Sequence, residues 1–151
     1  MINVPFPQAN DFEKIIAIVN IEDSAKLKDS NAIGVYLGDI SSRQVGYYVS
    51  ACIYLNIINK EKEFTEIGQR LRSMYGIEQK AEFARIIVSD DIFGSVYFRQ
   101  KMLGIKLGRE DVIDIMKQHL TFECEPMYVR RASTVISWVK WISNNEEQPI
   151  E

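Results

Sequence analysis

Apolar residues recur three and four positions apart through most of this chain, and breaks between these patterns predict a series of short helices. In the first half, a helix of about a dozen residues begins at Phe12, a short one follows a cap at 29–31, and a longer one covers about 42–56. A short helix, a break at 38–39 and a longer helix are typical of a helix-turn-helix. The longer helix is expected to bury one apolar face, made of Val45, Tyr48, Val49, Cys52 and Leu55.

A small β-hairpin is predicted directly after that motif. The segments 54–58 and 64–68 flank a polar turn over 59–63, which is the pattern of two short strands around a charged turn. Thr65 is expected to begin the next helix, which would end near Met74. A hairpin in this position would be a wing, so the first half is predicted to be a winged helix-turn-helix.

The second half repeats this plan. Amphipathic patterns predict helices over 78–88 and 91–103, with Gly104 as a stop, and a further helix before a break at 121–126. A final helix is predicted over about 126–144, with an apolar stripe along its length.

These elements together predict a mainly α-helical fold. It would consist of two tandem helix-turn-helix units, the first over residues 1–75 with the small β-hairpin wing and the second over 76–151, packed against the first. A length of 151 residues is enough for two small fused units of this kind.

Two of the predicted helices combine an apolar face with a face that carries bases and hydroxyls. The stretch 41–60 contains two basic residues and no acid, and 126–143 contains three basic residues and no acid. In a helix-turn-helix the second helix places its first residues against base edges, where arginine pairs with guanine and glutamine with adenine. The side chains offered for contact with DNA are Ser42, Arg43, Gln44 and Tyr47 on the first helix, and Arg130, Arg131, Thr134 and Lys140 on the last.

Each of these features also has a simpler structural interpretation. Arg43 and Gln44 suit a solvated helix start equally well, and one of Tyr47 and Tyr48 is expected in the core. The last helix equally suits a C-terminal packing helix, with its two tryptophans packed against the other helices of the second half.

Charge and cysteine content narrow the class of protein. The formal net charge is -3, which argues mildly against nucleic acid as the main partner, although local charge can override the total. Cys52 and Cys124 lie far apart and are expected to be free thiols, as in a reducing cytoplasm. The start of the chain has no signal-peptide pattern, and no apolar segment is long enough to span a membrane, so a cytoplasmic protein is predicted.

No arrangement of side chains typical of catalysis is apparent. His119 is the only histidine and has no neighbour at metal-ligand spacing, and Glu123-Cys124-Glu125 lacks a base that could activate the thiol. We therefore expect no bound metal, no cofactor and no catalysis by this chain alone.

Two segments carry a resemblance to a known family. Residues 43–48, followed by 54–58 and 64–68, match a recurrent bacterial pattern in the same order as the closing segments 130–135 and 137–142. Over about residues 29–142 the chain resembles the tandem winged-helix module fused to type II restriction endonucleases and found in related stand-alone proteins. In those enzymes the module reads the target sequence while another domain cuts.

The resemblance implies double-stranded DNA as the partner, with a nuclease domain or subunit as a further possibility. The resemblance implies two reading helices, which are the helices that contact base edges. By position, the first would present Arg43, Gln44 and Tyr47, and the second would present Tyr128, Arg130, Arg131 and Thr134. The sequence departs from the family pattern at two places that bear on these contacts. Asn56 stands where the pattern usually has glycine, and the acids at 123–125 directly precede the second reading helix. Two alternative functions are left open. One is a stand-alone transcriptional regulator, and the other is a winged-helix protein-interaction domain without DNA binding.

Overall fold

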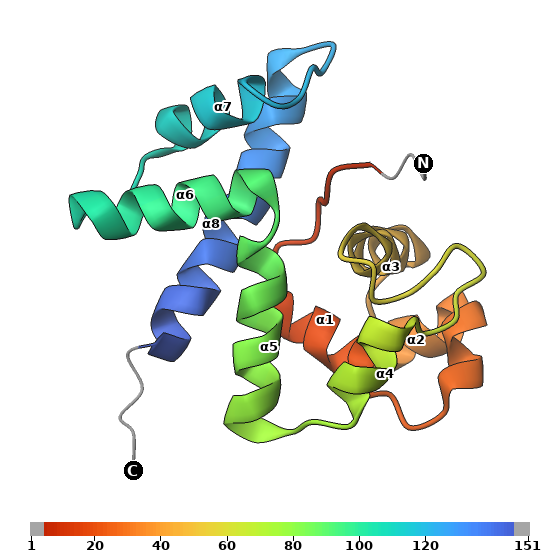
Figure 1. Ribbon diagram of the computed structural model, residues 1–151. Coiled ribbons are helices and arrows are strands. Elements are labelled where there is room, and N and C mark those ends of the chain that lie inside the picture. The colour runs from red at the N-terminus through yellow and green to blue at the C-terminus, as the bar shows by residue number, and fades with distance from the viewer. Residues whose placement is uncertain (1–4, 147–151) are drawn as a thin grey trace. The chain divides into compact units, whose positions relative to one another are not determined.

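The computed structural model describes residues 5–146, most of which lie in helices (Figure 1). The chain forms two units, one up to Gln79 and the other from Lys80 onward. Within the described residues no strand is present, and the predicted mainly α-helical fold is confirmed. None of the helices in this part of the chain is long and apolar enough to cross a membrane.

The first unit begins with five short helices whose starts are capped by side chains. They are α1 (Phe12–Val19), the 3-10 helix η1 (Ser24–Lys28), α2 (Ser30–Tyr36), α3 (Ser42–Tyr54) and α4 (Glu66–Arg72). Their caps each accept a hydrogen bond from a backbone N–H in the first turn, which satisfies a donor that the helix itself leaves open. The capping residues are Asp11, Asp23, Asp29, Ser41 and Thr65.

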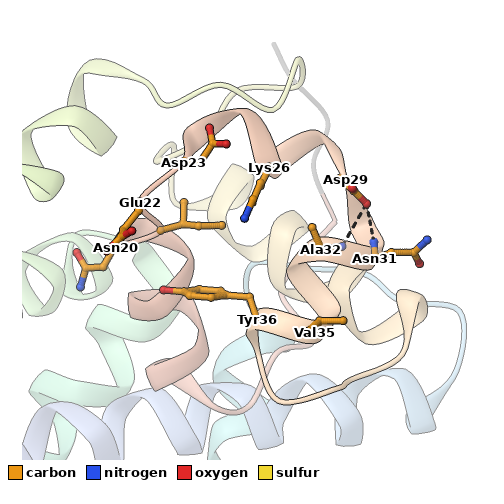
Figure 2. Close-up of a pocket in the computed structure, with 10 residues that line it drawn as sticks. Asn20, Glu22, Asp23, Lys26, Asp29, Asn31, Ala32, Val35 and Tyr36 are labelled. Atoms are coloured by element: carbon orange, nitrogen blue, oxygen red, sulfur yellow. Dashed lines mark hydrogen bonds between the residues drawn. The ribbon is translucent and has the colours of Figure 1, made fainter.

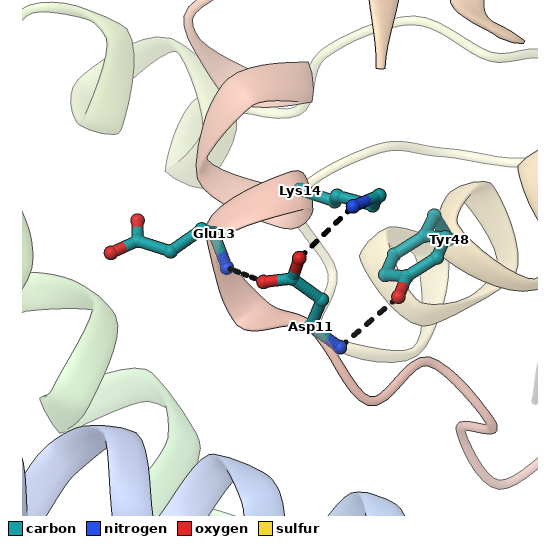
Figure 3. Close-up of polar contacts among 4 residues, drawn as sticks. All are labelled: Asp11, Glu13, Lys14 and Tyr48. Atoms are coloured by element: carbon teal, nitrogen blue, oxygen red, sulfur yellow. Dashed lines mark hydrogen bonds and ion pairs between the residues drawn. The ribbon is translucent and has the colours of Figure 1, made fainter. Parts of the chain in front are cut away.

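The start of α1 is tied to the middle of α3 (Figure 3). The hydroxyl of Tyr48 accepts a hydrogen bond from the backbone N–H of Asp11 over 3.0 Å. The Asp11 carboxylate accepts from the N–H of Glu13 and from Lys14 Nζ, and the latter bond raises the pKa of Lys14. The predicted inward face of α3 is confirmed, because all five of its side chains are buried. These contacts fix α3 against α1 and leave its first turn at the surface.

The predicted two-stranded wing is not formed. Between Ile57 and Thr65 the chain makes a single antiparallel bridge, Ile58 to Phe64, around a turn. The backbone N–H of Ile57 still bonds to Cys52 at the end of α3, and Thr65 already caps α4, so neither side has room to extend into a strand. Asn56 has φ 60°, in the left-handed region that glycine adopts freely and asparagine tolerates. Asparagine can therefore occupy this position, although most other side chains would be strained there.

The second unit contains the rest of α5 (Gly76–Val88), which crosses the boundary between the units, and three further helices: α6 (Asp91–Leu103), α7 (Arg109–Lys117) and α8 (Glu125–Glu146). Helix α6 ends at Gly104, whose φ of 67° confirms the predicted stop. Helix α8 packs against α6 and α7. Trp138 is completely buried and stacks on Phe93 with ring centroids 4.7 Å apart, as expected for a packing residue. The apolar stripe predicted on the last helix comprises Ala132, Val135, Ile136, Val139 and Ile142. Its members are buried except for Ile136, which is only half-buried.

Candidate nucleic-acid interface

The first turn of α3 is held in shape by a capping box. The Ser41 hydroxyl accepts a hydrogen bond from the N–H of Gln44 over 3.2 Å, and Gln44 Oε1 accepts from the N–H of Ser41 over 3.4 Å. This reciprocal pair is favoured at helix starts because it satisfies two backbone donors at once. The box fixes where α3 begins and therefore which side chains occupy its exposed end.

Four of the predicted contact residues lie in the first two turns of α3, and we refer to them as the α3 face: Ser42, Arg43, Gln44 and Tyr47. The first three are exposed and Tyr47 is half-buried. Arg43 Nε–H donates to the Tyr47 hydroxyl over 3.1 Å, and the Arg43 guanidinium carbon lies 5.8 Å from the centre of the Tyr47 ring. The guanidinium is thus oriented by a neighbour one turn along the helix while its remaining N–H groups stay at the surface.

The electrostatic setting of the α3 face is moderately favourable for an anion. Helix α3 contains no carboxylate, and its first turn carries the positive end of the helix dipole. The exposed Asp39 lies two residues before the Ser41 cap and partly offsets this field. The turn over 59–63 adds little, because the bases Lys60 and Lys62 alternate with the exposed acids Glu61 and Glu63.

In the second unit, two predicted contact residues are buried. The Tyr128 hydroxyl accepts from the N–H of Phe122 over 3.0 Å and donates to the carbonyl of Leu120 over 3.2 Å. Thr134 is completely buried. Both side chains are therefore part of the packing of the unit and do not form an exposed contact surface with the rest of α8.

The three basic residues predicted on α8 are dispersed. Arg130 and Lys140 are exposed, but ten residues of helix separate them by roughly 15 Å. Arg131 is half-buried: its Nη1–H donates to the carbonyl of Met127, and its guanidinium carbon lies 4.9 Å from the centre of the Phe122 ring. Arg131 therefore stabilises the start of α8, and only Arg130 remains fully available near that end.

A further arginine, not singled out by the sequence patterns, joins α7 to α8. Arg109 Nη1 donates to the carbonyl of Val129 over 3.0 Å and to the Ser133 hydroxyl over 2.9 Å. The acids at the start of α8 are partly neutralised, because Lys117 Nζ lies 2.6 Å from Oε1 of Glu125, and the hydrogen bond to this acid raises the pKa of Lys117. Glu123 is exposed and carries its charge at the same helix start.

The groups expected to lack a catalytic role occupy ordinary positions. His119 is exposed, Cys124 is exposed, and Cys52 is completely buried, which raises the pKa of its thiol to about 12. Over residues 5–146 no cluster of three or more histidine, cysteine and acidic side chains is placed to hold a metal ion.

Comparison with known proteins identifies a family but no characterised relative. Neither the curated proteins nor the solved structures give a match to this chain. A family model matches residues 14–147, which is most of the chain. The chain therefore belongs to the family described as Domain of unknown function (DUF7226).

Proposed function

We propose that this chain is a module that binds double-stranded DNA through the α3 face. The observation that carries the proposal is the position of Ser42, Arg43 and Gln44, exposed on the first turn of a helix whose opposite side is anchored in the core. These residue types suit DNA recognition, because arginine forms paired hydrogen bonds with guanine, glutamine with adenine, and a hydroxyl bonds to phosphate.

Helices α2 and α3 would act as the two helices of a helix-turn-helix, with α3 in the major groove. Binding requires Gln44 to release its capping bond to Ser41, and at 3.4 Å that bond is long for a hydrogen bond. Loss of this bond should therefore cost little free energy, on the order of 0.5 kcal/mol. A paired contact to a base contributes more than that.

The resemblance to restriction-enzyme modules supports a more specific role. We propose that the chain is the recognition part of a restriction system in which a nuclease domain or subunit elsewhere performs the cleavage, so that catalysis is not expected from this chain. A stand-alone regulator that reads DNA in the same way is the alternative within this class.

The competing function is that of a protein-interaction domain. It is favoured by the net charge of -3 and by large apolar side chains at the surface, among them Met102 at 87% exposure. The two classes differ in salt dependence, because DNA binding releases counterions and must weaken as salt rises.

Selection of bound duplexes from a random pool at moderate salt tests the proposal directly. We expect one enriched motif and an affinity that falls with salt. Arg43→Ala should weaken binding to that motif by about 1–3 kcal/mol and relax the preference at one base pair. Arg70→Ala, on the exposed side of α4, changes the net charge equally and should retain the motif.

One result would overturn this proposal, and another would change the role of Arg43. Absence of enrichment, with retention that does not depend on salt, excludes DNA recognition. An equal loss on all duplexes after Arg43→Ala would instead assign Arg43 to phosphate and remove it from the reading of bases.

A further inference from the structure

The second half of α6 presents an apolar surface that the second unit does not cover. All of the buried residues of α6 lie in its first six positions, and every residue from Lys101 to Lys106 is exposed. We call the exposed apolar residues of this surface the α6 knob. They are Phe98, Met102, Leu103 and Ile105, whose exposed fractions are 55%, 87%, 59% and 60%. If a large free side chain offers roughly 150–200 Å², the knob exposes roughly 400–500 Å², as much as the largest patch on a typical monomer.

The surroundings of the knob are basic. From Ile92 to Arg109 the sequence contains four basic residues and no acid. Arg99 and Lys106 are exposed within or beside the apolar side chains, while Lys101 pairs with Glu146 over 2.6 Å. A partner surface that fits the knob should therefore be apolar in the middle and acidic at its edge.

The first unit carries a surface that combines apolar and acidic side chains (Figure 2). There, residues 20–23, η1, Asp29 and α2 line a hollow of about 750 Å³, which we call the α2 hollow. Val35 and Tyr36 contribute exposed apolar surface to it, at 69% and 46%, and the Tyr36 hydroxyl is held by the carbonyl of Ala17 over 2.8 Å. Three acids and one base also line it, namely Glu22, Asp23, Asp29 and Lys26.

We propose that the α6 knob of one copy docks into the α2 hollow of a second copy of this chain. The two surfaces are complementary in charge and both contain exposed apolar side chains, whereas two knobs facing each other would bring Arg99 and Lys106 against their own counterparts. A second copy is therefore the partner that supplies the required surface without any additional protein.

The proposed contact joins two different surfaces, so each copy can take part twice. Two copies form a closed dimer if each places its knob in the hollow of the other. Otherwise the same contact repeats from copy to copy and forms a ring or an open filament. One contact of this size is small for a stable complex, but two together approach the roughly 1,600 Å² of a standard interface.

Sedimentation of the full chain at increasing concentration, without nucleic acid, tests the pairing. We expect reversible self-association that weakens as salt rises. Met102→Glu on the knob and Val35→Arg in the hollow should each raise the dissociation constant at least tenfold, because each puts like charge into the contact. Both positions are strongly exposed, so neither change disturbs the core.

The decisive step is to mix the two variants. An equimolar mixture should associate again, because the new acid on one knob meets the new base in the other hollow while the second contact is unaltered. Ile77→Glu and Ile77→Arg are matched controls at a position that is 77% exposed and outside both surfaces, and they should leave association unchanged. A chain that stays monomeric at all concentrations, association unaffected by either variant, or a mixture that does not recover would each overturn the pairing.

Discussion

Two glycines in helices of the first unit should respond in opposite directions to the same substitution. Gly46 lies in the middle of α3, where a Cβ would meet no atom within 4 Å. Gly68 lies in α4, where a Cβ would fall 2.3 Å from the carbonyl oxygen of Ile57 and 3.1 Å from Cδ1 of Phe64. The side chain added is identical, so the difference between the two sites is the space around the new methyl group.

The magnitudes follow from this geometry. Gly46→Ala should raise the free energy of unfolding by about 0.5–1 kcal/mol, because alanine loses less backbone entropy than glycine in a helix. At Gly68 the same gain is opposed by a backbone overlap that no rotamer change relieves. The Ile57 carbonyl is also fixed, because it accepts the N–H of Thr65 over 3.0 Å and the Thr65 hydroxyl over 3.1 Å. Moving α4 away from this carbonyl should cost more free energy than the alanine contributes. Gly68→Ala should therefore lower the free energy of unfolding by about 1–3 kcal/mol.

Urea denaturation of the two variants and the unchanged chain, followed by circular dichroism, measures both effects. The expected result is a higher midpoint for Gly46→Ala and a lower one for Gly68→Ala, with little change in slope. Two shifts of the same sign, or a Gly68→Ala variant as stable as the unchanged chain, would refute the argument from close packing.

Further predictions concern two polar side chains that form hydrogen bonds within the fold, Tyr128 and Arg72, and the two cysteines. Tyr128→Phe removes a buried hydroxyl with two hydrogen bonds and should lower stability by about 1–3 kcal/mol, with no change in the duplex sequence selected. Arg72→Met leaves the carbonyls of Val19 and Ile21 without their donor and should also cost about 1–3 kcal/mol in urea denaturation, whereas a loss below about 0.3 kcal/mol would mean that water replaces the guanidinium. A thiol reagent should label Cys124 at once and Cys52 only on unfolding. Because burial raises the Cys52 pKa to about 12, the unfolded chain loses this proton first as pH rises through about 9, so stability should fall from there toward pH 12, and Cys52→Ala should flatten that fall.

Much of the fold could be predicted because helix starts and stops are local features. Ser41, Asp29 and Thr65 cap the helices predicted from them, and α6 has the bounds that its periodicity gives. The 3-10 helix η1 was not predicted, because five residues are too few to show a period and only Leu27 among them is buried.

The wing was predicted from two short segments on either side of a polar turn, and this pattern does not decide whether strands form. The apolar residues on both sides of the turn are needed in the core, where Ile57 and Ile58 are buried, and this burial requires no ladder of hydrogen bonds. Whether a pair of segments extends into strands depends on how closely the helices on either side approach, which is a tertiary property.

For the candidate site, the periodicity of α8 already indicated that two of the predicted contact residues, Tyr128 and Thr134, lie on buried faces of the helix. Tyr128 lies four residues before the buried Ala132, and Thr134 lies four before the buried Trp138, so both positions share faces with core residues. Arg109 could not be found in this way, because its partners Val129 and Ser133 lie on another helix twenty or more residues later.

Similar polar residues make different contacts in the two units, and this difference bears on where the proposed DNA binding would occur. In the second unit Arg131, Arg109 and Tyr128 make hydrogen bonds or ring contacts within their own fold, and the start of α8 keeps an exposed acid. In the first unit Arg43 is oriented only by Tyr47 and faces solvent on a helix without acids. A group already bonded within the fold gives up that bond when it binds DNA, so its net contribution to affinity is smaller. Arg43→Ala should therefore reduce affinity for the selected duplex more than Arg131→Ala does, and the reverse order would move the reading helix from α3 to α8.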